Sequence, residues 1–233
     1  MKQLLKELFD KYKIDYSEQM LEQLEGFYEI VVEENKKFNL TAITKVNDFA
    51  IKHILDCALP AKLISKNATV IDIGAGAGFP SVVLKIIRPD LKITMIDALN
   101  KRVNFLNNTV QSLGLENIVA YHERAEDFAL KNRESFDVAI ARAVAGLNTL
   151  CEYCMPFVKL GGVFIAMKGS AYNEELEVAK NAIELLGGTL QEIQKSIIAE
   201  IDGERANIII KKVKQTSTKY PRGKNLPRLK PIV

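Results

Sequence analysis

A predicted strand that runs straight into three closely spaced glycines is the feature that most constrains how this chain can fold. Residues 70–81 read VIDIGAGAGFPS, in which an apolar run is followed by Gly74, Gly76 and Gly78. Glycine adopts positive φ at no steric cost and lets a ligand approach the backbone closely. The proline that follows favours the first turn of a helix, which we predict over residues 80–88. The stretch therefore predicts a strand–turn–helix unit with a ligand at its turn.

Strands and helices alternate through most of the chain that follows. Short apolar runs predict strands over residues 69–73, 91–97, 117–122, 135–142 and 161–168. Helical spacing of apolar residues predicts further helices over residues 100–113, 146–158 and 172–186. This alternation is typical of an α/β fold with a mostly parallel sheet that is covered on both faces. Two last strands, over residues 190–200 and 205–213, follow each other without a helix, so we expect a seven-stranded sheet with an antiparallel hairpin at one edge.

The beginning and the end of the chain differ from this central part. Residues 3–37 and 47–64 show helical spacing, with Ser17 as a candidate N-cap. We therefore predict three parts: an N-terminal helical cap over residues 1–64, a central domain over residues 65–213 and a C-terminal tail over residues 214–233.

The C-terminal tail is strongly basic. Residues 211–233 carry eight lysines and arginines and no acid, so a net charge of +3 leaves about −5 for the rest of the chain. A basic tail on an acidic body favours a polyanionic partner, nucleic acid first. The same composition is typical of a solvated, disordered tail, and the sequence leaves both interpretations open.

The composition points neither to secretion nor to a membrane. The apolar runs are too short to cross a bilayer, and the N-terminal segment mixes acids and bases, unlike a secretory signal. Three cysteines do not suggest a disulfide framework, so we expect a cytoplasmic protein. Cys151 and Cys154 have the spacing of half a metal site, but no second pair exists and both fall on an apolar helix. We predict that they are core residues and that no metal binds.

The glycine turn fits one class of nucleoside cofactor better than another. Asp97 ends the second predicted strand, 19 residues after Gly78, where an acid can accept hydrogen bonds from ribose hydroxyls. The dinucleotide fingerprint requires G-x-G-x-x-G, and the spacing of Gly74, Gly76 and Gly78 differs from it. With Asp72 two residues before the first glycine, the pattern resembles the first motif of S-adenosylmethionine-dependent methyltransferases. The predicted cofactor is therefore S-adenosylmethionine, held by a Rossmann-like fold.

Taken together, these segments resemble the ribosomal RNA small subunit methyltransferase G family, also called glucose-inhibited division protein B. The resemblance runs along nearly the whole chain and rests on the order and spacing of FNLTAI (38–43), HILD (53–56), DIGAGAGFP (72–80), DALNKRVNFL (97–106), RAEDF (124–128), ARA (141–143), MKG (167–169), DGER (202–205) and YPR (220–222).

The resemblance implies an enzyme that transfers a methyl group from S-adenosylmethionine to nitrogen 7 of one guanine in 16S ribosomal RNA. The residues that match the family's cofactor positions are Gly74, Phe79, Asp97, Ala98, Leu99, Ala125, Glu126 and Arg142, to which the turn itself adds Gly76 and Gly78. For the RNA, the resemblance implies Lys101, Lys168 and Arg205. The partner would be 16S ribosomal RNA or the small ribosomal subunit, and we expect a monomer.

The chemistry of nitrogen 7 agrees with what the sequence lacks. This atom carries a lone pair and no proton, so it can attack the methyl group without a general base. Alignment and electrostatics must then carry the catalysis. The fourth strand ends in Ala141-Arg142-Ala143-Val144, without the Asn/Asp-Pro-Pro-aromatic motif typical of exocyclic amine methylation. No cysteine has the Pro-Cys setting that pyrimidine carbon-5 methylation requires.

Several charged and polar residues have two interpretations each. Arg142 and Lys168, our candidate catalytic residues, end neighbouring strands and could hold a phosphate or the guanine carbonyl edge, or form a surface ion pair. Lys101 could contact RNA or be a solvated residue at a helix start. His53 could face the substrate or bond locally to an acid on the same helix face, Asp56. Asn39 could face the substrate or serve as a turn residue.

Two other functions remain open from the residues alone. A nicotinamide-dependent oxidoreductase would also use a glycine turn and an acid, although the glycine spacing counts against it. A non-catalytic RNA-binding assembly factor would also carry a basic tail, so the tail does not discriminate between an enzyme and a binding protein.

Overall fold

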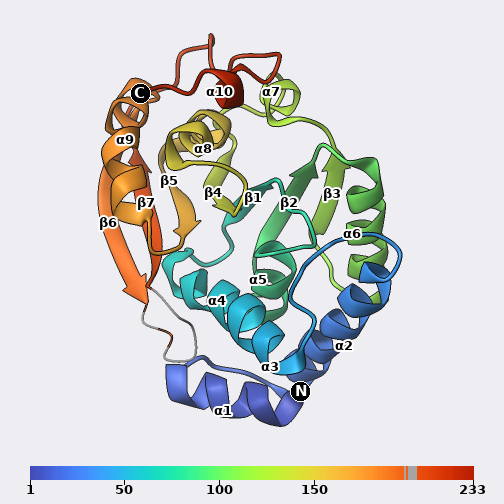
Figure 1. Cartoon of the computed structure of the whole chain (residues 1–233). Coiled ribbons are helices and arrows are strands. Elements are labelled where there is room, and N and C mark those ends of the chain that lie inside the picture. Colours follow the sequence, from blue (N-terminus) through green and yellow to red (C-terminus); the bar gives the residue numbers. More distant parts are fainter. Residues whose placement is uncertain (197, 199–203) are drawn as a thin grey trace.

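The computed structural model describes residues 1–196, 198 and 204–233. Within these residues, seven strands form one sheet in the order β3-β2-β1-β4-β5-β7-β6 (Figure 1). The strands are β1 Thr69–Ile73, β2 Lys92–Asp97, β3 Ile118–His122, β4 Phe136–Arg142, β5 Val158–Lys168, β6 Gly188–Ser196 and β7 Arg205–Lys212. β1 to β5 pair in parallel, whereas β7 pairs antiparallel with both β5 and β6. The predicted α/β fold with an antiparallel edge hairpin is confirmed. Residues 197, 199 and 200 of the predicted sixth strand lie outside the described residues.

The side chains of the strands alternate between two hydrophobic layers, as the pleat of a strand requires. One layer packs on the N-terminal helices and on α5 (Ser81–Ile87) and α6 (Asn100–Ser112), with strand residues Val70, Ile93, Met95, Val138, Ile140 and Ile165. The other packs on α7 (Ala125–Phe128), α8 (Leu147–Cys154) and α9 (Tyr172–Leu185), with strand residues Ile71, Ile96, Ala139, Ala141, Phe164 and Ala166. Both faces of the sheet are therefore covered.

The N-terminal helices share a core with the sheet. α1 is Lys2–Tyr12 and α2 is Glu18–Asn35, and Ser17 caps α2 because its Oγ accepts a hydrogen bond from the Met20 amide at 3.2 Å. The ring of Phe27 on α2 lies 5.3 Å from that of Phe79 in the glycine turn. The helical cap is thus packed directly on the turn, and the domain boundaries predicted at residues 64 and 213 stay a prediction.

The helix predicted over residues 47–64 is continuous but irregular. It consists of α3 Val46–Phe49, the π-helical η1 Ala50–Leu55, α4 Asp56–Ala58 and the 3-10 helix η2 Leu59–Leu63. Pro60 lies in the first turn of η2 and cannot donate a backbone hydrogen bond there. π-Helical stretches are frequently found at functional sites, and this one carries His53.

The helix predicted over residues 146–158 is too long. α8 ends at Cys154 and is followed by the 3-10 turn η3, Met155–Phe157. Pro156 lacks the amide hydrogen that an α-helix would need, and Val158 already belongs to β5. Cys151 and Cys154 are fully buried in the hydrophobic layer, as predicted. Among the described helices, none combines the length and apolarity needed to cross a membrane.

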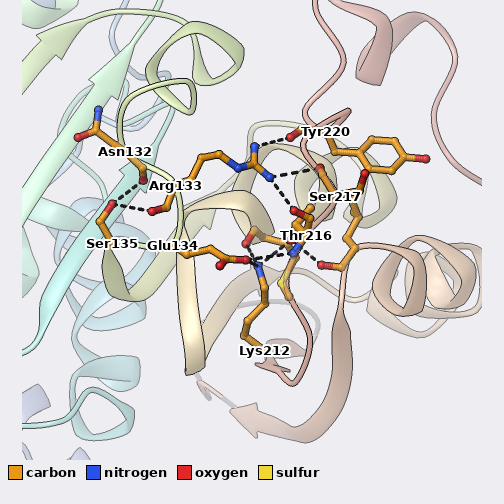
Figure 2. Close-up of polar contacts among 10 residues, drawn as sticks. Asn132, Arg133, Glu134, Ser135, Lys212, Thr216, Ser217 and Tyr220 are labelled. Carbon is orange, nitrogen blue, oxygen red and sulfur yellow. Dashed lines mark hydrogen bonds and ion pairs between the residues drawn. The ribbon is translucent and has the colours of Figure 1, made fainter.

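The C-terminal tail is packed on the body, so its interpretation as a disordered segment is wrong. Figure 2 shows Arg133 donating to the carbonyls of Tyr220 at 2.6 Å, Thr216 at 2.8 Å and Ser217 at 3.2 Å. Lys212, buried below, donates to Thr216 Oγ1 at 2.6 Å and approaches Glu134 at 3.3 Å. Near its end the tail forms a short helix, α10 (Leu226–Leu229), which lies close to α7 and α8 (Figure 1).

Replacing Arg133 with alanine should lower the free energy of unfolding by about 2 kcal/mol, because charge-assisted hydrogen bonds to three tail carbonyls are lost together. Urea unfolding measures the difference. The neighbouring exposed lysine provides the control, because Lys131→Ala also removes one positive charge and should change stability by less than about 0.5 kcal/mol. Equal effects of the two substitutions would contradict the role of Arg133 as an anchor.

Candidate active site

The first cavity lies at the carboxyl ends of the central parallel strands, where ligands bind in open α/β sheets. It has a volume of about 470 Å³, within the range of small-molecule sites. Six predicted cofactor residues line it: Gly74, Asp97, Ala98, Leu99, Ala125 and Glu126. The structure therefore brings together residues from the ends of β1 and β2 and from the segment after β3.

Asp97 fixes the shape of the glycine turn. Its Oδ2 accepts a hydrogen bond from the Gly76 amide at 3.0 Å, and its Oδ1 accepts one from the Leu99 amide at 2.9 Å. The amides of Gly74 and Ala75 donate to the carbonyl of Ile96 at 2.9 and 3.2 Å. The turn after β1 is thus tied to the end of β2, and each carboxylate oxygen of Asp97 keeps a further lone pair for a hydroxyl group.

Close packing explains why glycine is needed at the start of this turn. Gly74 has φ +75°, and a Cβ atom at this position would lie 2.9 Å from Cγ2 of Val144. A side chain here would therefore meet both backbone strain and a clash. The glycine backbone lets a ligand approach closely, and the carboxylate of Asp97 can accept hydrogen bonds from it. Together with the cavity volume, these features fit the nucleoside and amino-acid parts of S-adenosylmethionine.

Asp72, the acid before the first glycine, is buried beneath the turn and does not line the cavity. Burial raises the pKa of the Asp72 carboxyl to about 7, and interactions with Ser81 oppose the shift.

A second cavity, of about 530 Å³, adjoins the first. Ala143 and Val144, which follow β4, line both cavities. The second cavity contains both cations and carboxylates; its charged and histidine lining residues are Lys52, His53, Asp56, Arg142, Lys168, Glu175 and Arg205. Of the predicted residues, His53, Arg142, Lys168 and Arg205 are thus brought together here.

Arg142 connects the helical cap to the end of β4. Its Nη1 donates to the Lys52 carbonyl and to Asp56 Oδ2, both at 3.1 Å, and its Nη2 lies 2.9 Å from His53 Nδ1. Burial raises the pKa of the Asp56 carboxyl, while Arg142 and Arg205 oppose that shift. His53 and Asp56 therefore meet on Arg142, rather than simply bonding to each other on the helix face.

The contacts of His53 determine its protonation. Burial and the neighbouring Arg142 lower the pKa of His53 to about 3, so the ring is neutral at physiological pH. Because Arg142 donates to Nδ1, the ring proton is on Nε2, which lies 2.8 Å from Thr41 Oγ1. The ring also stacks on Phe79, with 4.2 Å between centroids.

Lys168 is held in an ion pair at the wall of the second cavity. Its Nζ lies 2.6 Å from Glu175 Oε2 and donates to the Ala145 carbonyl at 2.7 Å. Glu175 also accepts a hydrogen bond from the Leu147 amide at 2.7 Å. Arg205 lies 3.9 Å from Asp56. Each carboxylate of this cavity is therefore paired with at least one cation.

Other predicted residues lie outside the two cavities. Gly78 packs near Val82 and Leu106, and Phe79 lies between the aromatic core and Arg142, which is 5.0 Å from its ring. Lys101 lies over the ring of Phe38 in a separate cleft. Asn39 is exposed. The functional roles of these residues stay predictions.

Sequence reasoning missed several residues that line the cavities, among them Arg102, Glu123 and Arg124 at the first cavity. Tyr153, Asn225 and Arg228 line the first cavity, and Glu175 lines the second. The basic composition of the tail drew attention to residues such as Arg228, but charge alone does not show that Arg228 lies at the cavity. Glu175 lies in the first turn of α9, where an acid is common for helix stability alone, so its type carried no signal.

A family model described as GidB, rRNA small subunit methyltransferase G, matches residues 20–206. The chain belongs to this family. The ribosomal RNA small subunit methyltransferase G of Desulforamulus reducens is 46% identical to it, over 98% of this chain and 97% of the relative. That of Oceanobacillus iheyensis is 48% identical over 94% of both chains. As a member of the family, the chain is an S-adenosylmethionine-dependent rRNA methyltransferase.

Solved structures show the same fold for more distant methyltransferases. M. jannaschii TYW2 in complex with AdoMet has a TM-score of 0.57 at 18% identity, over 69% of this chain and 76% of its own. An SAM-dependent O-methyltransferase of Thermotoga maritima has a TM-score of 0.55 at 14% identity, over 80% of this chain and 72% of its own. Family membership sets aside the nicotinamide-dependent alternative.

The neutral state of His53 can be measured by NMR. We expect the ring nitrogens of His53 to report the neutral Nε2–H tautomer throughout pH 5–8, because burial and Arg142 both disfavour the charged ring. A His122→Gln variant assigns the signals, since the sequence has two histidines and His122 is exposed. Titration of His53 with a midpoint near 6.5 would contradict the contacts described above.

Proposed function

We propose that this enzyme transfers the methyl group of S-adenosylmethionine to nitrogen 7 of a guanine in 16S ribosomal RNA. The cofactor occupies the first cavity and the guanine enters the second. The observation that carries the proposal is that both cavities share the wall formed by Ala143 and Val144. A methyl donor and an acceptor base can therefore be held next to each other, which is the main requirement of a direct transfer.

The transfer is a single displacement with no proton to remove. The nitrogen 7 lone pair forms a bond to the methyl carbon while the carbon–sulfur bond breaks and sulfur keeps that electron pair. The positive charge moves from the sulfonium to the guanine ring. His53 is neutral, but both of its ring nitrogens are engaged, by Arg142 and Thr41. Asp56 and Glu175 are paired with cations. The cavity is thus arranged for positioning and electrostatics, as nitrogen 7 chemistry requires.

The charged residues have distinct proposed roles. Arg142 and Lys168 orient the guanine, because guanidinium and ammonium groups donate to the O6 acceptor on the same edge as nitrogen 7. Arg205 and Lys101 contact RNA phosphates, and His53 and Asn39 line the approach of the substrate. Gly74, Asp97, Leu99 and Glu126 hold the cofactor. We further propose that the enzyme acts as a monomer in the cytoplasm on the small ribosomal subunit or its RNA.

The test is methyl transfer from radiolabelled S-adenosylmethionine to bacterial small subunits that lack the modification, with the product mapped by mass spectrometry. Wild type should form a single 7-methylguanosine. Asp97→Ala should lower the rate by about 100-fold, because the glycine turn loses its clamp and the ribose its acceptor. Asp127→Ala removes an exposed acid on α7 outside both cavities and should keep the wild-type rate.

The other outcomes are equally informative. Wild type that binds the cofactor but modifies neither subunits nor their RNA would favour a non-catalytic assembly factor. Methylation at another guanine atom would overturn the proposed chemistry while leaving the cofactor site intact.

A further inference from the structure

The C-terminal tail reaches the cofactor cavity through a series of contacts with α8. One of the two arginines of the tail, Arg222, donates to Glu152 through its amide at 2.8 Å, its Nε at 2.9 Å and its Nη2 at 2.6 Å. Glu152 is fully buried while Arg222 is partly exposed, so the guanidinium compensates a carboxylate that has no other access to water. Thr149 donates to the Pro227 carbonyl at 3.0 Å. Two residues of α8, Thr149 and Glu152, therefore hold the tail at Pro227 and Arg222.

These contacts place two tail residues in the wall of the first cavity. Asn225 and Arg228 line it together with Asp97 and Glu126. Asn225 Oδ1 accepts a hydrogen bond from the Tyr153 hydroxyl at 3.2 Å. Arg228 Nη2 donates to the Val144 carbonyl at 2.8 Å, while the rest of this side chain is exposed at the cavity. Both positions lie beyond residue 206, where the match to the family model ends.

Arg228 is hydrogen-bonded to Val144, which packs against the glycine turn. Val144 is the side chain that a Cβ on Gly74 would meet at 2.9 Å, so the guanidinium is linked to the turn through a single residue. A guanidinium has five N–H donors, and one hydrogen bond to a carbonyl leaves donors for a second acceptor. The bound cofactor carries one anionic group, the carboxylate of its amino-acid part, which is the strongest partner for an arginine.

We propose that the C-terminal tail forms a wall of the cofactor site and that Arg228 pairs with the carboxylate of bound S-adenosylmethionine. Cofactor binding and docking of the tail then stabilise each other, because the same residues take part in both. The inference uses the cofactor that the family establishes and does not depend on which base is methylated.

Calorimetry with S-adenosylhomocysteine tests the pairing without any RNA. Arg228→Ala should weaken binding by about tenfold, as the loss of a charge-assisted pair predicts. The matched control is Lys230→Ala, which removes the same charge two residues later at an exposed position outside the cavity. It should bind within about twofold of wild type, as expected for a distant, screened charge. Equal effects of the two substitutions would overturn the inference.

A second ligand identifies the group that Arg228 contacts. Methylthioadenosine has the adenosine part and the sulfur but no carboxylate, so Arg228→Ala should weaken its binding by less than about twofold. An equal loss for both ligands would overturn the pairing with the carboxylate. The nitrogen 7 proposal is tested separately by the mapped product and would survive either result.

Limited trypsin digestion measures the coupling. The tail contains cleavage sites at Lys219, Arg222, Lys224 and Arg228. S-adenosylhomocysteine should slow cleavage at Lys219 and Arg222 severalfold in wild type and much less in Arg228→Ala, because the linking contact is lost. The anchors on α8 are intact in this variant, so its fold is kept. Cleavage that is unaffected by the ligand in wild type would overturn the proposed coupling.

Discussion

Arg142 is the side chain through which the N-terminal helices and the sheet form one site. It ends β4, and its guanidinium reaches the Lys52 carbonyl, Asp56 and His53 on the irregular helix of the cap. The same group lies 5.0 Å from the ring of Phe79 in the glycine turn. A buried guanidinium is costly unless its donors are used, and here they are spread over several partners. The part of the second cavity that the cap contributes, with Lys52, His53 and Asp56, therefore depends on these contacts with the end of β4.

Much of the fold could be predicted because local patterns and tertiary packing agree in it. The strand that ends at Ile73 is mostly apolar, buried on both faces and followed by glycines. Few conformations other than a central strand followed by a tight turn are compatible with this pattern. The π-helical stretch around His53 could not be predicted, because its apolar spacing is that of an ordinary helix and Arg142, which contacts it, is far away in the sequence. Likewise, Pro156 was a local signal for the early end of α8, but the helix was predicted from apolar periodicity, which continues past this proline.

The residues of the site fall into the same two groups: some could be predicted from the local sequence, and others enter the site only through tertiary packing. Asp97 could be predicted because its role follows from a strand end and a fixed distance to the glycines. Glu175 and Arg228 could not, since each enters a cavity through packing between elements that lie far apart in the sequence. The basic composition of the tail indicated a polyanion or disorder, and the ion pair between Arg222 and the buried Glu152 shows a third solution. Part of the positive charge of the tail is used to attach it to the body.

The charges of the second cavity suit a reaction that moves a positive charge without creating one. Three of the four cations of this cavity, Arg142, Lys168 and Arg205, would by themselves disfavour a guanine that becomes positively charged as its nitrogen 7 is methylated. Asp56 and Glu175 stand between these cations and offset them at distances of 2.6 to 3.9 Å. Cationic donors can then hold the O6 edge of the base while the nearby carboxylates stabilise the charge that leaves the sulfonium. A cavity lined by the cations alone would bind RNA phosphate as well and would favour the transition state less.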